Sequence, residues 1–469
     1  KVSILMPSLN VAPYIRECIE SVLCQTLEDI EILCIDAGST DGTWELLEQY
    51  AKKDSRVRLL KSDKKSYGYQ MNLGLGEARG EYIGIVETDD FVLPGMYEAL
   101  YAYAKRQDAD YVKSDFDLFT TLEDGERLFL RYSLKRHSGV RYDAVYTPED
   151  FLTRKQTVDI FIWNGIYRRE FLLQRGIAFQ ETPGAAFQDC GFRYQVVLWA
   201  QRGFFLERSF YRYRRDNVSS STYNSRCVLF NLAECRHLLR IAKETGLGEA
   251  QMAFLARETA VIALAPYVEL LTWGSPAKET KGALEEFRAI LKGFLAQGLL
   301  TQASVTRDAW LSIRMFVENP DFYDYYAHLK AEVTAGEARD FVREMAAKRQ
   351  VVLFGSGFVG ACAYCLLRNH GISNIVAFCD NDAGKWGSAY LGCLVLPPKE
   401  AAERFPDACY LIANAACADE MERQLRALGI SGEQVTAYSL PASPMDATNF
   451  VMRLGGGDVY AGRTDASDR

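Results

Sequence analysis

The feature that most limits the fold is an alternation of short apolar runs with amphipathic helical patterns between residues 2 and 114. Five of the apolar runs have the length and composition of buried strands. They are Val2–Met6, Glu31–Ile35, Val57–Leu60, Tyr82–Val86 and Tyr111–Ser114. The clearest helical pattern, at residues 13–23, begins with a proline, which is suited to the first turn of a helix. Strands that alternate with helices predict a doubly wound α/β fold with a mostly parallel sheet.

Polar residues gather where three of these strands are predicted to end. The first strand runs into Pro7–Asn10, the second into Asp36–Thr43, and the fourth into Glu87–Asp90, which holds three carboxylates in four positions. Ligands of open α/β sheets bind at the carboxyl ends of the strands, so we expect these turns to border one crevice. Carboxylates such as Asp89 and Asp90 are suited to a divalent cation that neutralises a diphosphate. The alternative is that one of them caps the following helix.

Composition limits the class of protein. At 469 residues the chain is too long for one ordinary core, and its 48% hydrophobic and 25% charged residues are typical of globular proteins. A net charge of -8 argues against nucleic acid as a partner. Twelve cysteines without a framework spacing favour reduced thiols in a cytoplasmic protein. Lys1 leads directly into a strand pattern, and charges interrupt the apolar stretch 251–273, so we expect no signal peptide and only peripheral contact with the inner face of the membrane.

Six ordered motifs in about the first 115 residues resemble those of glycosyltransferase family 2. They are Pro7-Ser8-x-Asn10, Ser21-Val-Leu-x-Gln25-Thr26, Ile35-Asp36-x-Gly38-Ser39-Thr40-Asp41-Gly42-Thr43, Asn72-x-Gly74, Gly80-Glu81-Tyr82-Ile83 and Thr88-Asp89-Asp90. The resemblance continues more weakly to about residue 220. It implies the GT-A fold, a nucleotide-sugar donor and a transfer that inverts the anomeric centre.

The resemblance also implies which residues border the donor. They are Pro7, Asn10, Asp36, Asn72, Glu87, Thr88 and Asp89. Asp89 and Asp90 would hold Mn²⁺ or Mg²⁺. The features that depart from the family pattern are Leu9, Ala37, Glu87 and the segment 66–71. The base of the nucleotide is therefore less firmly implied than the reaction, and two tyrosines in that segment are open alternatives for stacking on a base or sugar.

Residues 116–222 are expected to hold the acceptor. Trp163 and Asn164 resemble the start of the family's Trp-Asn-Lys element, in which a glycine stands in place of the lysine here. Gln188-Asp189 resembles the family's Glu-Asp motif. An inverting transfer needs one base to take the proton of the acceptor hydroxyl, and we expect Asp189 to be that base. The alternative is that its carboxylate only stabilises the N-terminus of a helix.

A run of tyrosines and arginines at residues 211–217 allows two interpretations. In the first, Arg214 or Arg215 reaches the leaving diphosphate or the phosphate of a lipid-linked acceptor. In the second, the run is a solvated edge strand in which Asp216 is an ion-pair partner.

A glycine-rich pattern returns near the end of the chain, after a helical stretch over about 225–348. Gly355, Gly357 and Gly360 follow a short apolar run, and Asp380 comes about twenty positions later. This strand-turn-helix setting is typical of a dinucleotide site, which makes NAD or another nucleotide a candidate second ligand. The segment has about half the size of a full dinucleotide-binding domain. It resembles the small Rossmann-like domains appended to glycosyltransferases, which favours binding or assembly over redox chemistry.

The sequence therefore predicts four parts: a GT-A domain at 1–222 with a donor half (1–115) and an acceptor half (116–222), a helical linker at 223–348, a Rossmann-like domain at 349–441 and a polar tail at 442–469. We expect a metal-dependent, inverting glycosyltransferase that modifies a bacterial cell-surface glycan or its lipid-linked precursor. Two alternatives stay open. One is a bifunctional enzyme with an NAD-dependent, sugar-modifying C-terminal domain, and the other is a catalytically degenerate module that binds glycan or nucleotide. A homo-oligomer is open as well.

Overall fold

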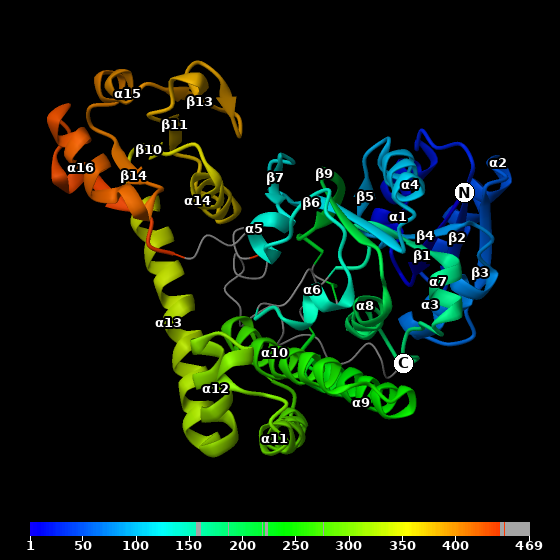
Figure 1. The fold of residues 1–469 in the computed structure, drawn as a ribbon. Helices are drawn as coiled ribbons and strands as arrows, with labels where there is room; N and C mark the ends of the chain where they lie inside the picture. The colour runs from blue at the N-terminus through cyan, green and yellow to red at the C-terminus, as the bar shows by residue number, and fades with distance from the viewer. Residues whose placement is uncertain are drawn as a thin grey trace. The chain divides into compact units, whose positions relative to one another are not determined.

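The computed structural model describes residues 1–155, 161–185, 187–217, 219–220, 224–274, 276–440 and 445. The described chain forms two units (Figure 1). The first contains Lys1–Asp117 and Arg131–Lys330, and the second contains Leu118–Leu130 and the described residues that follow Lys330.

The first unit opens with the predicted parallel sheet. Its strands are β1 (Val2–Ser8), β2 (Ile30–Asp36), β3 (Val57–Lys61) and β4 (Tyr82–Ile85). They pair in parallel in the order β3-β2-β1-β4. Every residue of β1 is buried, as expected for an apolar run at the centre of a parallel sheet. The predicted α/β fold is confirmed.

An antiparallel half continues this sheet. Its strands are β5 (Phe91–Val92), β6 (Tyr111–Thr121), β7 (Arg127–Tyr132), β8 (Gly165–Arg168) and β9 (Gly203–Arg214). Strand β8 lies antiparallel between β4 and β6, and the order then runs on through β9 to β5, while β7 pairs with β6. A Cβ atom at Gly165 would lie 2.3 Å from the carbonyl oxygen of Val112. This close approach explains why a glycine, and not a lysine, follows Asn164.

Helices connect and cover the strands of the first unit. The first six are α1 (Ala12–Leu23), α2 (Thr43–Lys53), α3 (Tyr67–Glu77), α4 (Met96–Gln107), α5 (Leu134–Ser138) and α6 (Pro148–Leu152). They are followed by α7 (Arg169–Gln174), α8 (Gln188–Trp199), α9 (Cys227–Thr245), α10 (Glu249–Trp273), α11 (Thr280–Ala296), η2 (Gln302–Ser304) and α12 (Arg307–Glu318). Helix α9 packs against α8 and α10, and α10 packs against α6. Most of the stretch predicted as a separate linker at 223–348 therefore belongs to the first unit.

Helix α13 (Pro320–Ala346) crosses the boundary between the units. The elements that follow it are β10 (Val351–Phe354), α14 (Phe358–Asn369), β11 (Ile375–Cys379), η3 (Ala383–Lys385), β12 (Ala389–Tyr390), β13 (Cys393–Leu396), α15 (Pro398–Arg404), β14 (Cys409–Ile412), η4 (Ala415–Cys417), α16 (Ala418–Ala427), η5 (Gly432–Gln434) and β15 (Val435–Ala437). Their sheet has the order β12-β13-β11-β10-β14-β15, and only the pair of β12 with β13 is antiparallel. Leu122, Leu128 and Leu130 of the β6–β7 hairpin share a core with Leu353 and Cys365, which assigns the hairpin to this unit.

Among the described residues, no helix is long and apolar enough to cross a membrane.

Candidate active site

The site is built around the turn that follows β4. The backbone N–H of Asp90 donates to the carbonyl of Glu87 at 3.0 Å, which closes the turn. Asp90 itself is only 1% exposed. Its carboxylate accepts hydrogen bonds from the Tyr211 hydroxyl (2.8 Å) and from the backbone N–H of Arg214 (2.7 Å). Burial, reinforced by the charge of Asp89, raises the pKa of Asp90 well above its usual value. Asp90 therefore fastens the turn to β9.

Asp89 is more accessible than Asp90. It is partly exposed, and its Oδ2 atom accepts a hydrogen bond from the Asn217 side chain at 2.7 Å. Its carbonyl accepts one from Nε of Arg214, also at 2.7 Å. Burial raises the pKa of Asp89, and the Asn217 bond and the Arg214 charge partly oppose that effect. No group of three or more His, Cys, Asp or Glu side chains within the described ranges is arranged to hold a metal. Of the two aspartates, Asp89 fits a cation better, because both carboxylate oxygens of Asp90 already accept hydrogen bonds.

Glu87 carries the most informative shift in this turn. The Tyr67 hydroxyl donates to its Oε1 atom at 2.6 Å, and its backbone N–H donates to the Tyr211 hydroxyl at 3.0 Å. Burial raises the pKa of Glu87 to about 8; the Tyr67 bond opposes the rise, while the charges of Asp89 and Asp189 add to it. Glu87 is therefore mostly protonated at neutral pH. The Tyr67 hydroxyl therefore binds Glu87 in this structure, and stacking of Tyr67 on a base or sugar remains a prediction.

Asp189 comes to the same place from the start of α8. The preceding loop is tied to the start of α3, since the backbone N–H of Tyr67 donates to the Gly184 carbonyl (2.9 Å) and that of Gly184 donates to Lys65 (2.8 Å). Tyr67 in turn donates to Glu87, and the charge of Asp189 contributes to the raised pKa of both residues, so the start of α8 and the turn after β4 belong to one electrostatic environment. The structure thus brings Asp189 together with the turn after β4, although about a hundred residues separate them in sequence.

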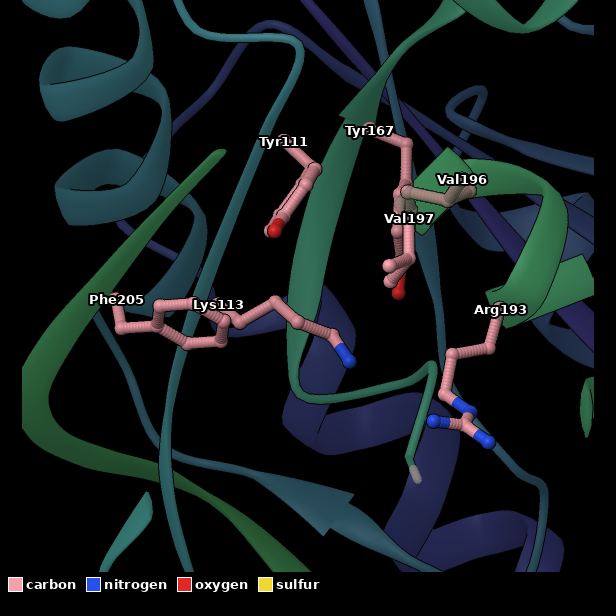
Figure 2. Close-up of a pocket in the computed structure, with 7 residues that line it drawn as sticks. All are labelled: Tyr111, Lys113, Tyr167, Arg193, Val196, Val197 and Phe205. Atoms are coloured by element: carbon pink, nitrogen blue, oxygen red, sulfur yellow. The ribbon is translucent and has the colours of Figure 1, made fainter. Parts of the chain in front are cut away.

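Two buried cations act electrostatically on Asp189. Lys113 of β6 and Arg193 of α8 line a small internal cavity of about 10 Å³, which is room for a single water molecule. Figure 2 shows their side chains converging on this cavity from different elements, together with the hydroxyls of Tyr111 and Tyr167. Burial raises the pKa of Asp189, and the backbone N–H of Cys190 and the charges of Arg193 and Lys113 only partly oppose this rise. The two cations therefore favour the ionised, proton-accepting form of this carboxylate.

Comparison with known proteins identifies the family. Residues 3–176 match the family model described as Glycosyl transferase family 2. The glycosyltransferase YibD of Escherichia coli (strain K12), whose name marks it as uncharacterized, is 31% identical over 248 residues, which cover 52% of this chain and 69% of YibD. Glycosyltransferase GlyG of Streptococcus pneumoniae serotype 4 is 30% identical over 222 residues, which cover 46% of this chain and 72% of GlyG. The chain belongs to glycosyl transferase family 2. It is a glycosyltransferase.

Two further comparisons define how far this likeness extends. EpsJ of Bacillus subtilis (strain 168), also named an uncharacterized glycosyltransferase, is 33% identical over 222 residues, but the match spans only 62% of EpsJ and 47% of this chain. The crystal structure of S. aureus TarS 1-349 in complex with UDP-GlcNAc has a TM-score of 0.50 at 18% identity, and the match covers 72% of this chain and 92% of that one. The TarS structure supports the GT-A fold of this glycosyltransferase.

Two of the residues predicted to border the donor form hydrogen bonds within the protein. The carboxylate of Asp36 accepts hydrogen bonds from the backbone and hydroxyl of Ser39, the backbone of Gly38 and the hydroxyl of Ser8. The side-chain oxygen of Asn10 accepts one from the Thr40 backbone at 2.8 Å. These bonds hold the turns after β1 and β2 in shape. A direct contact of either residue with a nucleotide remains a prediction.

The remaining donor-side residues also join elements of the glycosyltransferase to one another. The Thr88 hydroxyl donates to the carbonyl of Pro7 at 2.8 Å, which links the ends of β4 and β1. Asn72 of α3 exchanges two hydrogen bonds, of 2.8 and 2.9 Å, with the backbone of Phe179. These bonds hold neighbouring segments of the first unit together, and the contacts of Thr88, Pro7 and Asn72 with a donor remain predictions.

The acceptor-side residues are buried more deeply than a solvated surface would allow. The Trp163 ring stacks on Tyr211 with the ring centres 4.1 Å apart, and the Asn164 amide donates to the Ser114 carbonyl at 2.9 Å. Arg214 is only 7% exposed and pairs with Glu17 at 2.7 Å and with Asp216 at 3.4 Å. The predicted partner Asp216 is therefore present, but the pair is buried and not at a solvated edge. A phosphate contact of Arg214 remains a prediction.

The glycine-rich loop of the second unit is closed by its own acidic residue. Asp380 accepts hydrogen bonds from the backbone (2.8 Å) and hydroxyl (2.7 Å) of Ser356, and Lys385 pairs with it at 2.9 Å. Burial alone would raise the pKa of Asp380, but these bonds and that of the Asp382 backbone outweigh it and hold the pKa at about 2. Gly355 has a φ of +113°, and a Cβ atom at Gly360 would lie 2.0 Å from its carbonyl oxygen. These glycines are required by the turn itself, and a nucleotide on Gly355, Gly357 or Gly360 remains a prediction.

Sequence reasoning did not select four residues that shape the site, namely Lys113, Arg193, Tyr211 and Asn217. A signal was present for the first of these. Lys113 lies inside the apolar run predicted as the fifth strand, where a charged residue is costly unless it has a partner or a function. The other three show their role only through partners that are distant in the sequence.

Proposed function

We propose that this glycosyltransferase moves a sugar from a nucleotide-sugar donor to a bacterial cell-surface glycan or its lipid-linked precursor, with inversion of the anomeric centre. The proposal is supported mainly by the hydrogen bonds that join the loop before Asp189 to Tyr67, and Tyr67 to Glu87 in the turn after β4. An inverting transfer uses one base and one leaving group on opposite sides of the reacting carbon. Asp189 is suited to the role of the base, and the carboxylates after β4 are suited to a cation that would bind the leaving diphosphate.

In this mechanism Asp189 takes the proton from the acceptor hydroxyl. The hydroxyl oxygen attacks the anomeric carbon while the bond from that carbon to the diphosphate oxygen breaks. Arg193 and Lys113 favour the ionised form of Asp189 for this step, since their charges oppose the rise in pKa that burial causes. Glu87, with a pKa of about 8, is mostly neutral and does not repel the diphosphate. Two nearby carboxyl groups held in different protonation states are typical of acid–base sites.

We further propose Asp89 as the protein ligand of a divalent cation. Such a cation, when bound, would neutralise the negative charge of the leaving diphosphate. Asp89 is partly exposed, and burial raises its pKa, so a cation beside it would stabilise its ionised form. Asp90 would have to give up its bonds from Tyr211 and Arg214 to serve as a second ligand. We therefore assign Asp90 to holding the turn.

The test is a transfer assay over a panel of nucleotide-sugars, with UDP-GlcNAc included because TarS was crystallised with it. Each donor is measured with Mn²⁺, with Mg²⁺ and with a chelator, and the anomeric configuration of any product is read by NMR. We expect transfer or slow donor hydrolysis that depends on the cation, and a product of inverted configuration. Asp89→Ala should lose the cation dependence together with the activity, whereas Asp63→Ala, which removes an exposed aspartate, should keep both. A product of retained configuration would contradict the mechanism.

We do not extend the proposal to an NAD-dependent step. Asp380, the acidic residue of the predicted dinucleotide site, already binds Ser356 and Lys385.

A further inference from the structure

The second unit contains a pocket that is separate from its glycine-rich loop. The pocket has a volume of about 480 Å³, which is within the range of small-molecule sites. Its walls come from the loop after β11, the segment after β13 and the end of α16. The residues that matter for its chemistry are Asn381, Trp386, Pro397, Lys399, Gln424 and Leu428. Gly355, Gly357 and Gly360 do not line it, so it is distinct from the glycine-rich loop.

Trp386 supplies the aromatic part of the lining of this pocket. Its side chain is 42% exposed, although large aromatic side chains are usually buried to a greater extent. The indole N–H donates to the carbonyl of Asp380 at 2.7 Å, which fixes the ring in place. The loop beneath it is held as well, since the Asp380 carboxylate binds Lys385 and the backbone of Asp382. The exposed ring is therefore preorganised, and a ligand would not have to order it on binding.

Two amide side chains form the polar wall. Nε2 of Gln424 donates to Oδ1 of Asn381 at 2.8 Å, and Nδ2 of Asn381 donates back to Oε1 of Gln424 at 3.0 Å. Each amide has two N–H donors and an oxygen with two lone pairs, so this exchange uses half of their capacity. The pair holds both groups in fixed orientations. The remaining donors and acceptors are suited to hydroxyl groups, which need both.

We propose that this pocket binds a pyranose ring of a glycan. A pyranose has an apolar face of C–H bonds, which gains by lying on an exposed aromatic ring, and a rim of hydroxyl groups that each donate and accept hydrogen bonds. Trp386 matches the face, and Asn381 with Gln424 matches the rim. The site would allow the second unit to hold a sugar residue of a glycan chain, whether or not the first unit is transferring one.

A nucleotide fits the same walls less well. Its base could stack on Trp386, but its phosphates need convergent cations or backbone N–H groups. Lys399 is the cation among the lining residues, and its ammonium group lies 3.9 Å from Glu403 on the surface. Lys385, which lies on the same loop as Trp386, is paired with Asp380. The charge in this part of the described unit therefore favours an uncharged or singly acidic sugar.

The experiment is saturation-transfer-difference NMR on the full chain. The probes are the methyl β-glycosides of glucose, galactose, N-acetylglucosamine and glucuronic acid, with NAD and UDP in parallel samples. We expect at least one glycoside to receive saturation on the C–H protons of one ring face. In Trp386→Ala its affinity should fall at least tenfold, and Trp386→Phe should recover part of it. Phe322→Ala removes an aromatic side chain that is 51% exposed in the first unit, and it should leave binding unchanged.

A second variant distinguishes a loss of binding from a folding defect in Trp386→Ala. Gln424→Ala leaves the indole in place but breaks the amide pair, so it should weaken the same glycoside without a change in the melting temperature. The proposal is overturned if no glycoside binds the wild-type chain, or if both variants bind as the wild type does. It is also overturned if NAD or UDP, and no glycoside, loses binding in Trp386→Ala.

Discussion

The hydrogen bond from Tyr67 to Glu87 allows a quantitative test of the site. The two oxygen atoms are 2.6 Å apart, and a hydrogen bond to an ionised group contributes about 1.5–3 kcal/mol. One pKa unit corresponds to about 1.36 kcal/mol, so Tyr67→Phe should raise the pKa of Glu87 by about one to two units. The direction follows because the bond stabilises the ionised carboxylate, and its loss favours the protonated form. The starting value is about 8.

The assay is the pH dependence of kcat/KM for transfer. If neutral Glu87 is the form that accepts the donor diphosphate, wild-type activity falls as the pH rises through about 8. In Tyr67→Phe the fall should move up by about one to two pH units. Tyr69→Phe makes the same substitution two positions away, and should leave the fall where it is. Carbon-13 NMR of Glu87, assigned with Glu87→Gln, reads the pKa directly. An unchanged pKa in Tyr67→Phe would refute the reasoning.

Two further predictions concern stability and the base. Tyr211→Phe removes the hydroxyl that donates to buried Asp90 and accepts from the backbone N–H of Glu87, and each unpaired group costs about 1–3 kcal/mol. The free energy of unfolding should therefore fall by several kcal/mol in a denaturation experiment. Tyr101→Phe removes a more exposed hydrogen bond and should not show this loss. Equal stability of the two variants would contradict this. Lys113→Met removes a positive charge that lowers the pKa of Asp189, so the acid side of the kcat/KM profile should move to higher pH, by about one unit. A profile that moved to lower pH would show that Lys113 acts in another way.

The parallel half of the sheet was predictable because its signals are local. An apolar run and an amphipathic helix can each be recognised within about ten residues of sequence. The antiparallel half of the sheet was not predictable, because β8 pairs with β4 and β6, which are distant from it in the sequence. Nor was the hairpin at 118–130, whose leucines complete the core around Leu353 and Cys365. Nothing local distinguishes a hairpin that joins one unit from a hairpin that joins another.

The candidate site was predictable to a similar extent. Motifs marked Asp89 and Asp189, and the structure brings Asp189 to the turn after β4 through the backbone bonds between Gly184 and the start of α3. The sequence did not separate Asp89 from Asp90. Their difference depends on Tyr211, which lies more than a hundred positions away and occupies Asp90. Residue types can thus identify a candidate carboxylate, whereas its hydrogen-bond partners decide whether it is available to bind a cation.

The account depends most on Asp189 as the base that acts opposite the carboxylates in the turn after β4. The direct measurement is a single-turnover transfer assay at saturating donor with Asp189→Asn, beside Glu181→Gln as a matched change of an exposed carboxylate in the preceding loop. We predict a fall in the transfer rate of at least about a hundredfold in Asp189→Asn at unchanged donor affinity, and no fall in Glu181→Gln. A transfer rate near that of the wild type in Asp189→Asn would contradict the account.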